Sequence, residues 1–262
     1  MAIFFEELKQ SLKPFVFWMI GLAFLMLAGM GKFSAMATSP DAINALFDSW
    51  PKVVLATFGA VGLEVTTLSG YFGMMWMYAA LTVAVYAIGL GMRLTTLEVS
   101  DKNTDFVYAK PKSRAAILTY KLAAHVLYML VFVAASYAFT VLGLVIDKTK
   151  NTISTEINLL SIALVFIAFI YYAIAALAGA ITAKYGGLIA YIVLLSTYMG
   201  AVFYDIATKG ENIIRVLTPL KYFNPVDVIS AQALNTGYIA LSVGVISATL
   251  LGAYVVMSRK DF

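Results

Sequence analysis

The stretch INLLSIALVFIAFIYYAIAALAGAIT (157–182) decides the fold class, because it contains no charged side chain and is long enough to cross a bilayer. A helix of about 20 apolar residues spans the roughly 30 Å of hydrocarbon. The whole chain has the same character, with 62% hydrophobic residues, 12% charged residues and a mean hydropathy of +0.89. This composition lies outside the range of soluble globular proteins. We therefore predict an all-α membrane protein.

Six apolar runs in the chain are long enough to be membrane spans. They cover residues 15–31, 71–92, 118–146, 157–182, 187–204 and 238–257. Backbone groups in hydrocarbon must be hydrogen-bonded within their own segment, and the alternation typical of a barrel strand is missing, so each run is expected to be a helix. Residues 1–262 are expected to form a single transmembrane domain.

The distribution of Lys and Arg predicts the topology, because basic residues are retained on the cytoplasmic side. With the N-terminus inside, the cytoplasmic side holds eleven of the 18 basic residues: Lys9, Lys13, Arg93, Lys102, Lys110, Lys112, Arg114, Lys121, Lys184, Arg259 and Lys260. Both termini then face the cytoplasm, as does a loop over residues 93–117. Residues 32–70 and 205–237 are expected to be extracytoplasmic.

Residues 1–14 are predicted to form an amphipathic interfacial helix. Phe4, Leu8, Leu12 and Phe15 recur at near-helical spacing, as in helices that lie in the membrane plane. The polar side is expected to hold Glu6, Glu7, Lys9, Gln10 and Lys13. The alternative is an ordinary cytoplasmic segment that leads into the first span.

A short apolar stretch in the first outer segment, VVLATFGAVGL (53–63), has too few residues to cross the bilayer. We expect a re-entrant or interfacial helix here. The alternative is a seventh span, which would place the two termini on opposite sides of the membrane.

Motifs for enzymatic chemistry are missing from the chain. It has no Gly-x-Ser-x-Gly or His-Glu-x-x-His motif, no cysteine and a single histidine, which disfavours a membrane protease or a metal-dependent enzyme. His125 is expected to be satisfied by a neighbouring helix or by water rather than to be catalytic. The chain also lacks a Gly-x-x-x-x-Gly-Lys-Ser/Thr loop, so another subunit must bind any ATP that drives it.

Charged side chains are concentrated in one stretch, LEVSDKNTDFVYAKPKSRAAILTYK (97–121). This concentration indicates that the stretch has a function. Ser100 is a plausible N-cap, and a helix over 101–109 would end ahead of Pro111. This helix would expose Phe106 and Tyr108, which suits a groove on a partner protein. A basic loop that only determines topology explains the same charges, and both interpretations remain open.

The same stretch resembles a family pattern. The order Glu98, Thr104, Lys110-Pro111-Lys112-Ser113-Arg114 and Lys121 is similar to the glutamate, threonine, (K/S)P-x-S-R and lysine of type-2 permeases of ATP-binding cassette (ABC) transporters. The six spans, the stretch TPLKYFNP (218–225) and the ending SRKDF (258–262) extend the resemblance over nearly the whole chain. One residue departs from the pattern, since Asn103 occupies a place where the family commonly has glycine.

The resemblance implies that the short helix is a coupling helix seated in a cleft of a separate ATPase, with Phe106 as its apolar anchor. The implied interface consists of Glu98, Asp101, Thr104, Asp105, Phe106, Tyr108, Lys110 and Arg114. The family works as two permeases, either two copies or a pair of paralogues, with two ATPases that bind ATP and Mg. The chain itself is then expected to hold no cofactor or metal, to bind no nucleic acid, and to reside in the plasma (inner) membrane of a prokaryote.

The side chains of the predicted spans indicate the class of cargo. No Asp, Glu, Lys or Arg lies in the middle of a span, which disfavours an ion-coupled carrier and favours export of an amphipathic or apolar peptide, antibiotic or lipid-like molecule. The candidate substrate path consists of Met74, Met75, Trp76, Tyr78, Tyr171 and Tyr172. These side chains are alternatively packed or lipid-facing. The rival functional hypothesis is a non-transporting anchor or sensor that docks a signalling partner through residues 97–121.

Overall fold

The structure is an all-helical bundle in the part of the chain that it describes. The computed structural model describes residues 2–95, 114–149, 153–207 and 212–259. Six helices in these residues are long and apolar enough to cross a membrane. They are α1 (Ala2–Met30), α5 (Leu68–Thr95), α8 (Arg114–Ile146), α9 (Ser154–Ile181), α10 (Gly186–Ile206) and α13 (Thr236–Arg259). The prediction of six membrane helices is therefore confirmed.

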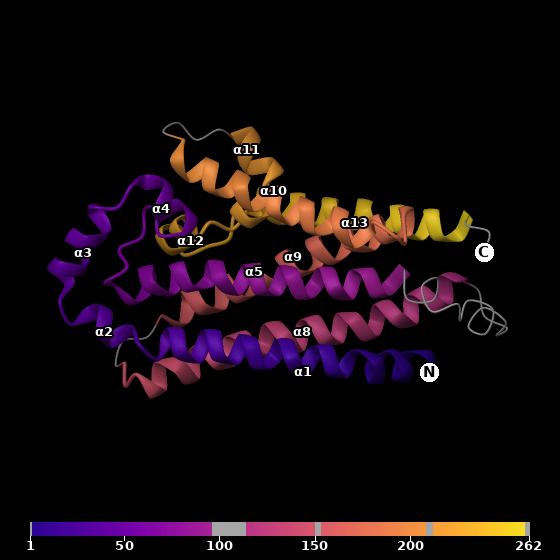
Figure 1. Cartoon of the computed structure of the whole chain (residues 1–262), viewed down its shortest axis with the longest axis horizontal. Helices are drawn as coiled ribbons and strands as arrows, with labels where there is room; N and C mark the ends of the chain where they lie inside the picture. The colour runs from indigo at the N-terminus through magenta and orange to yellow at the C-terminus, as the bar shows by residue number, and fades with distance from the viewer. Residues whose placement is uncertain (1, 96–113, 150–152, 208–211, 260–262) are drawn as a thin grey trace.

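All six helices extend beyond the apolar runs that predicted them. The longest helix, α8, has 33 residues, which corresponds to about 50 Å at the usual helical rise. That length exceeds the hydrocarbon thickness, so α8 must continue into the interface or beyond it. The start of α1 and the end of α13 lie at the same end of the bundle (Figure 1), in agreement with an even number of spans.

The N-terminal segment differs from its prediction. Residues 1–14 do not form a separate interfacial helix, because α1 continues without a break through Pro14 to Met30. Glu7, expected on the polar side, is only 3% exposed. It turns toward cationic side chains on α5 and α8, and this contact aligns the first turns of α1 with the bundle.

Short helices cover the other end of the bundle (Figure 1). They are α2 (Phe33–Ala37), α3 (Pro40–Asp48), α4 (Lys52–Thr57), α11 (Asn212–Leu217), η1 (Pro219–Lys221) and α12 (Pro225–Ala231). The stretch 53–63 is no seventh span, because α4 has six residues and is followed by turns at Gly59 and Gly62, both with positive φ. Its position relative to the membrane stays a prediction.

Ionic contacts hold this cap in place. Lys221 Nζ lies 2.7 Å from Asp205 at the end of α10, and both side chains are buried. Ser34 donates its backbone N–H and its hydroxyl to Asp147, at the end of α8. Desolvation alone would raise the pKa of Asp147, but the hydrogen bonds from Thr149 and Ser34 outweigh it and lower this pKa. The carboxylate therefore stays ionised as an acceptor at neutral pH.

The core of the bundle is the contact between α5 and α9, which the other long helices surround. Trp76 is buried, and its Nε1 donates to the Leu160 carbonyl at 2.8 Å. Gly91 lies against the backbone of Tyr172 and the side chain of Ala175. Small residues allow such close approach between membrane helices, where lipid provides no hydrophobic driving force.

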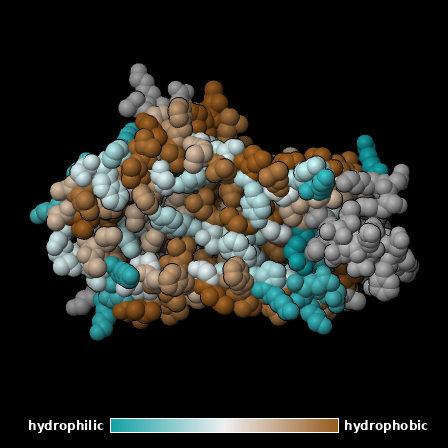
Figure 2. All heavy atoms as spheres, in the orientation of Figure 1, coloured by the Kyte–Doolittle hydropathy of each residue, from teal (hydrophilic) through white to brown (hydrophobic). Residues whose placement is uncertain are grey.

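Hydrophobic side chains remain on the outside of the bundle. Figure 2 shows them along the long edges of the molecule, whereas hydrophilic side chains gather toward its two ends. Large exposed apolar residues include Phe24 on α1, Val145 on α8 and Leu251 on α13. An exposed apolar surface of this kind fits a chain surrounded by lipid.

Replacement of Gly91 by alanine tests the contact between α5 and α9. An added Cβ atom would lie 2.3 Å from the Tyr172 carbonyl oxygen, so the helices would have to separate. We expect Gly91→Ala to cost about 1–3 kcal/mol, which lowers the unfolding midpoint in detergent by roughly 2–12 °C. Gly89→Ala is the matched control, because nothing lies within 4 Å of its added Cβ. Equal midpoints for the two variants would contradict the proposed close contact.

Candidate functional site

The ends of α5 and α8 that flank the predicted coupling loop carry the candidate site. Seven of the predicted interface residues lie outside the described residues: Glu98, Asp101, Thr104, Asp105, Phe106, Tyr108 and Lys110. The eighth, Arg114, begins α8, and its side chain is likewise outside the described part. The site is therefore built from the side chains that adjoin this loop on both sides.

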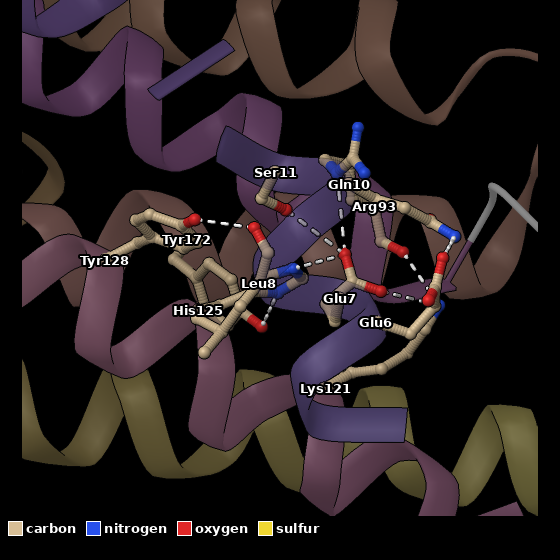
Figure 3. Close-up of polar contacts among 10 residues, drawn as sticks. All are labelled: Glu6, Glu7, Leu8, Gln10, Ser11, Arg93, Lys121, His125, Tyr128 and Tyr172. Atoms are coloured by element: carbon tan, nitrogen blue, oxygen red, sulfur yellow. Dashed lines mark hydrogen bonds and ion pairs between the residues drawn. The ribbon is translucent and has the colours of Figure 1, made fainter. Parts of the chain in front are cut away.

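Glu7 of α1 is the centre of the site (Figure 3). Its Oε1 lies 3.5 Å from Arg93 Nε at the end of α5, and its Oε2 lies 3.7 Å from Lys121 Nζ near the start of α8. The Arg93 contact is an ion pair without the alignment of a hydrogen bond. Ser11, one turn along α1, donates its hydroxyl to Glu7 Oε1 at 3.3 Å. A single buried carboxylate thus joins three helices.

His125 extends the site into the core (Figure 3). The ring is fully buried, with Nε2 3.0 Å from Glu7 Oε1 and Nδ1 3.0 Å from the Tyr172 hydroxyl. A carboxylate only accepts hydrogen bonds, so Nε2 carries the hydrogen, and Nδ1 of the neutral ring accepts from Tyr172. The prediction that neighbouring helices satisfy His125 is confirmed.

Two further hydrogen bonds close the site. Lys121 Nζ donates to the Arg93 carbonyl at 3.3 Å, which satisfies an acceptor in the last turn of α5. The Tyr128 hydroxyl of α8 donates to the Leu8 carbonyl of α1 at 2.6 Å. The two flanks of the loop are therefore bonded to each other as well as to α1.

The side chains of this cluster hold helices in position. It contains one carboxylate, two cations and a histidine whose two ring nitrogens are both hydrogen-bonded. In the described part of the chain, no group of three or more His, Cys, Asp or Glu side chains is arranged to hold a metal ion. The arrangement suits the transmission of a displacement between helices better than a reaction.

The candidate substrate path occupies the core of the subunit. Trp76, Tyr171 and Tyr172 are buried and hydrogen-bonded, to Leu160, Thr197 and His125 respectively. Met74 and Met75 are also buried, and Tyr78 is the only one of the six that is not. Within this chain these residues pack α5 and α9 against their neighbours, and their contact with cargo stays a prediction.

Sequence reasoning placed Glu7 with the exposed polar residues and so missed the centre of the site. The spacing did hold a signal, because Glu7 and Ser11 lie one turn apart, as do Lys121 and His125. Arg93 ends the second span at the same predicted membrane face. Polar side chains that recur one turn apart at facing ends of spans can satisfy one another without water.

The geometry defines a multi-pass membrane protein whose charged contacts lie at the ends of its helices. A family model described as ABC-2 family transporter protein matches residues 1–262, and the chain belongs to this family. It is thus a membrane permease subunit, as the resemblance implied, and the family implies association with an ABC ATPase. No curated protein and no solved structure matches the chain.

Removal of the charge on Glu7 tests whether this carboxylate joins the three helices. Glu7→Gln leaves Arg93 and Lys121 without their shared carboxylate, so we expect a loss of about 2 kcal/mol of stability, as for hydrogen bonds to a charged group, and an unfolding midpoint lower by roughly 4–8 °C. Glu6→Gln is the control, because Glu6 is exposed and accepts a hydrogen bond from Gln10 on its own helix. Thermal unfolding in detergent measures both variants, and a neutral Glu7→Gln would show that the cluster is dispensable for stability.

Proposed function

We propose that this chain is the membrane subunit of an ATP-driven exporter, with an amphipathic or apolar peptide, antibiotic or lipid-like molecule as its cargo. A separate ATPase would bind ATP and Mg and dock on residues 97–121. Membership of the ABC-2 family supports the ATPase partner. The cargo class is supported by the lack of Asp, Glu, Lys and Arg in the middle of the predicted spans.

The observation that carries this proposal is the position of Glu7 between the two flanks of the loop. Arg93 lies in the last turns of α5 and Lys121 in the first turns of α8, on the two sides of the predicted coupling helix (101–109), and both contact Glu7. A displacement of the loop by an ATPase would move the ends of α5 and α8 together. Through Glu7 and the Leu8 carbonyl it would also move α1, so three helices would respond to one partner.

The proposed complex contains two permease chains and two ATPases in the plasma (inner) membrane of a prokaryote. Closure of the ATPases on ATP would push the coupling loops and change the side to which a cavity between the permeases opens. This step needs two states of the bundle, and hydrolysis would bias the equilibrium between them. The lack of a charged side chain in the middle of the spans favours ATP over an ion gradient as the energy source, and export is the direction that we propose.

Phe106→Ala tests the docking of the ATPase. We expect this variant to insert and fold but to retain at least about tenfold less ATPase in an affinity pull-down from mild detergent, since an apolar anchor in a cleft contributes about 2 kcal/mol or more. ATP hydrolysis by the recovered complex should fall in parallel. Phe58→Ala is the matched control, because Phe58 is an exposed phenylalanine at the opposite end of the bundle.

Two outcomes would contradict the proposal. If no ATPase accompanies the wild-type chain, the exporter hypothesis fails, and a signalling protein recovered in its place would support the anchor or sensor function. If the ATPase is recovered equally with Phe106→Ala and Phe58→Ala, Phe106 is not the apolar anchor.

A further inference from the structure

A lateral groove between α8 and α9 is not explained by the proposed transport cycle. Its volume is about 580 Å³, within the range of small-molecule sites. Leu130, Ala134 and Tyr137 of α8 form one wall, and Asn158, Ser161 and Ile162 of α9 form the other. Both helices are membrane spans, so the groove opens toward the bilayer.

The polarity of the groove changes with depth. Asn158 lies four residues and Ser161 seven residues after the start of α9, or about 6 and 10 Å along the helix. Leu130 lies at the middle of α8, 16 residues before its end at the same membrane face, or about 24 Å along the helix. The groove is therefore polar near the membrane surface and apolar near the middle of the bilayer.

The polar side chains of the groove have no partner within the described chain. Within the described residues, no hydrogen bond uses the side chains of Asn158, Ser161 or Tyr137, and both Asn158 and Tyr137 are exposed. Near the membrane surface, the headgroup region of the bilayer supplies oxygen acceptors for such donors. An occupant with oxygen acceptors near the surface and an alkyl chain below would satisfy both parts of the groove.

We propose that this groove binds one phospholipid of the surrounding bilayer. Its ester and phosphate oxygens accept hydrogen bonds from the Asn158 amide and the Ser161 and Tyr137 hydroxyls, and an acyl chain lies between Leu130, Ala134 and Ile162. No charged side chain lines the groove, so recognition does not depend on the charge of the headgroup. A second copy of the chain explains this polarity less well, because a packed helix would have to supply matching polar groups at one end only.

Native mass spectrometry of the purified full chain tests the site, with palmitoyl-oleoyl phosphatidylcholine and phosphatidylglycerol added in separate experiments. We expect one lipid to be retained per chain, with similar retention for the two headgroups. Asn158→Leu should lower retention roughly fivefold, as the loss of one net hydrogen bond implies, and Ala134→Phe should lower it by filling the groove. Ser247→Leu is the control, because it removes an exposed polar side chain from the membrane face of α13.

A second measurement keeps the test decisive if a groove variant fails to fold. The chain has no cysteine, so Ile162→Cys and Leu251→Cys each provide a single labelling position. A bimane label at position 162 should be quenched by brominated phosphatidylcholine at about equimolar lipid, whereas the label at position 251 should need excess lipid.

Three results would overturn the proposal. One is unchanged lipid retention in folded Asn158→Leu and Ala134→Phe. Another is a clear preference for the anionic lipid, which uncharged donors do not explain. The third is efficient disulfide formation between two copies of Ile162→Cys, which would show that a second chain covers the groove. None of these results bears on whether an ATPase docks on residues 97–121.

Discussion

Inside hydrocarbon every backbone polar group must find its partner within the protein, and the rest of this structure depends on that constraint. It makes each span a helix, and it leaves the helices to associate through close packing rather than through the exclusion of water. Two contacts between α5 and α9 result directly. Gly91 lies against the backbone of Tyr172, and Trp76 donates a hydrogen bond to the Leu160 carbonyl. The other spans then pack around this pair.

In the described residues, the charged contacts lie at the two ends of the bundle and serve different purposes there. Lys221 with Asp205 holds the cap of short helices against α10. At the opposite end, Glu7 with Arg93 and Lys121 joins α1 to both flanks of the predicted coupling loop. A loop attached to one helix would move that helix alone, whereas a loop whose flanks share a buried carboxylate can move three. This is why the Glu7 cluster, rather than an aromatic residue of the core, is the centre of the proposed coupling.

The exposed surface along the spans is less uniformly apolar than the composition of the chain indicates. Most of the exposed surface on the spans is apolar, as a lipid-facing surface requires. The groove between α8 and α9 interrupts it with Asn158, Ser161 and Tyr137. The helices move in the proposed transport cycle. A bound phospholipid would fill the gap between α8, which packs mainly against α1, and α9, which packs mainly against α5. Lipid binding and ATP coupling would then be separate properties of the same subunit.

Composition and the length of the apolar runs were enough to predict six helices, because the bilayer admits few other structures. The family followed from short motifs in the correct order, and the single histidine was correctly expected to be satisfied by its neighbours. Spacing alone did not show that α1 is continuous from Ala2 or that Glu7 is buried. The sequence of α1 alone does not show that the ends of α5 and α8 bring Arg93 and Lys121 to Glu7. Only the tertiary structure decided this, because the burial of a carboxylate depends on cations that are distant in the sequence and close in space.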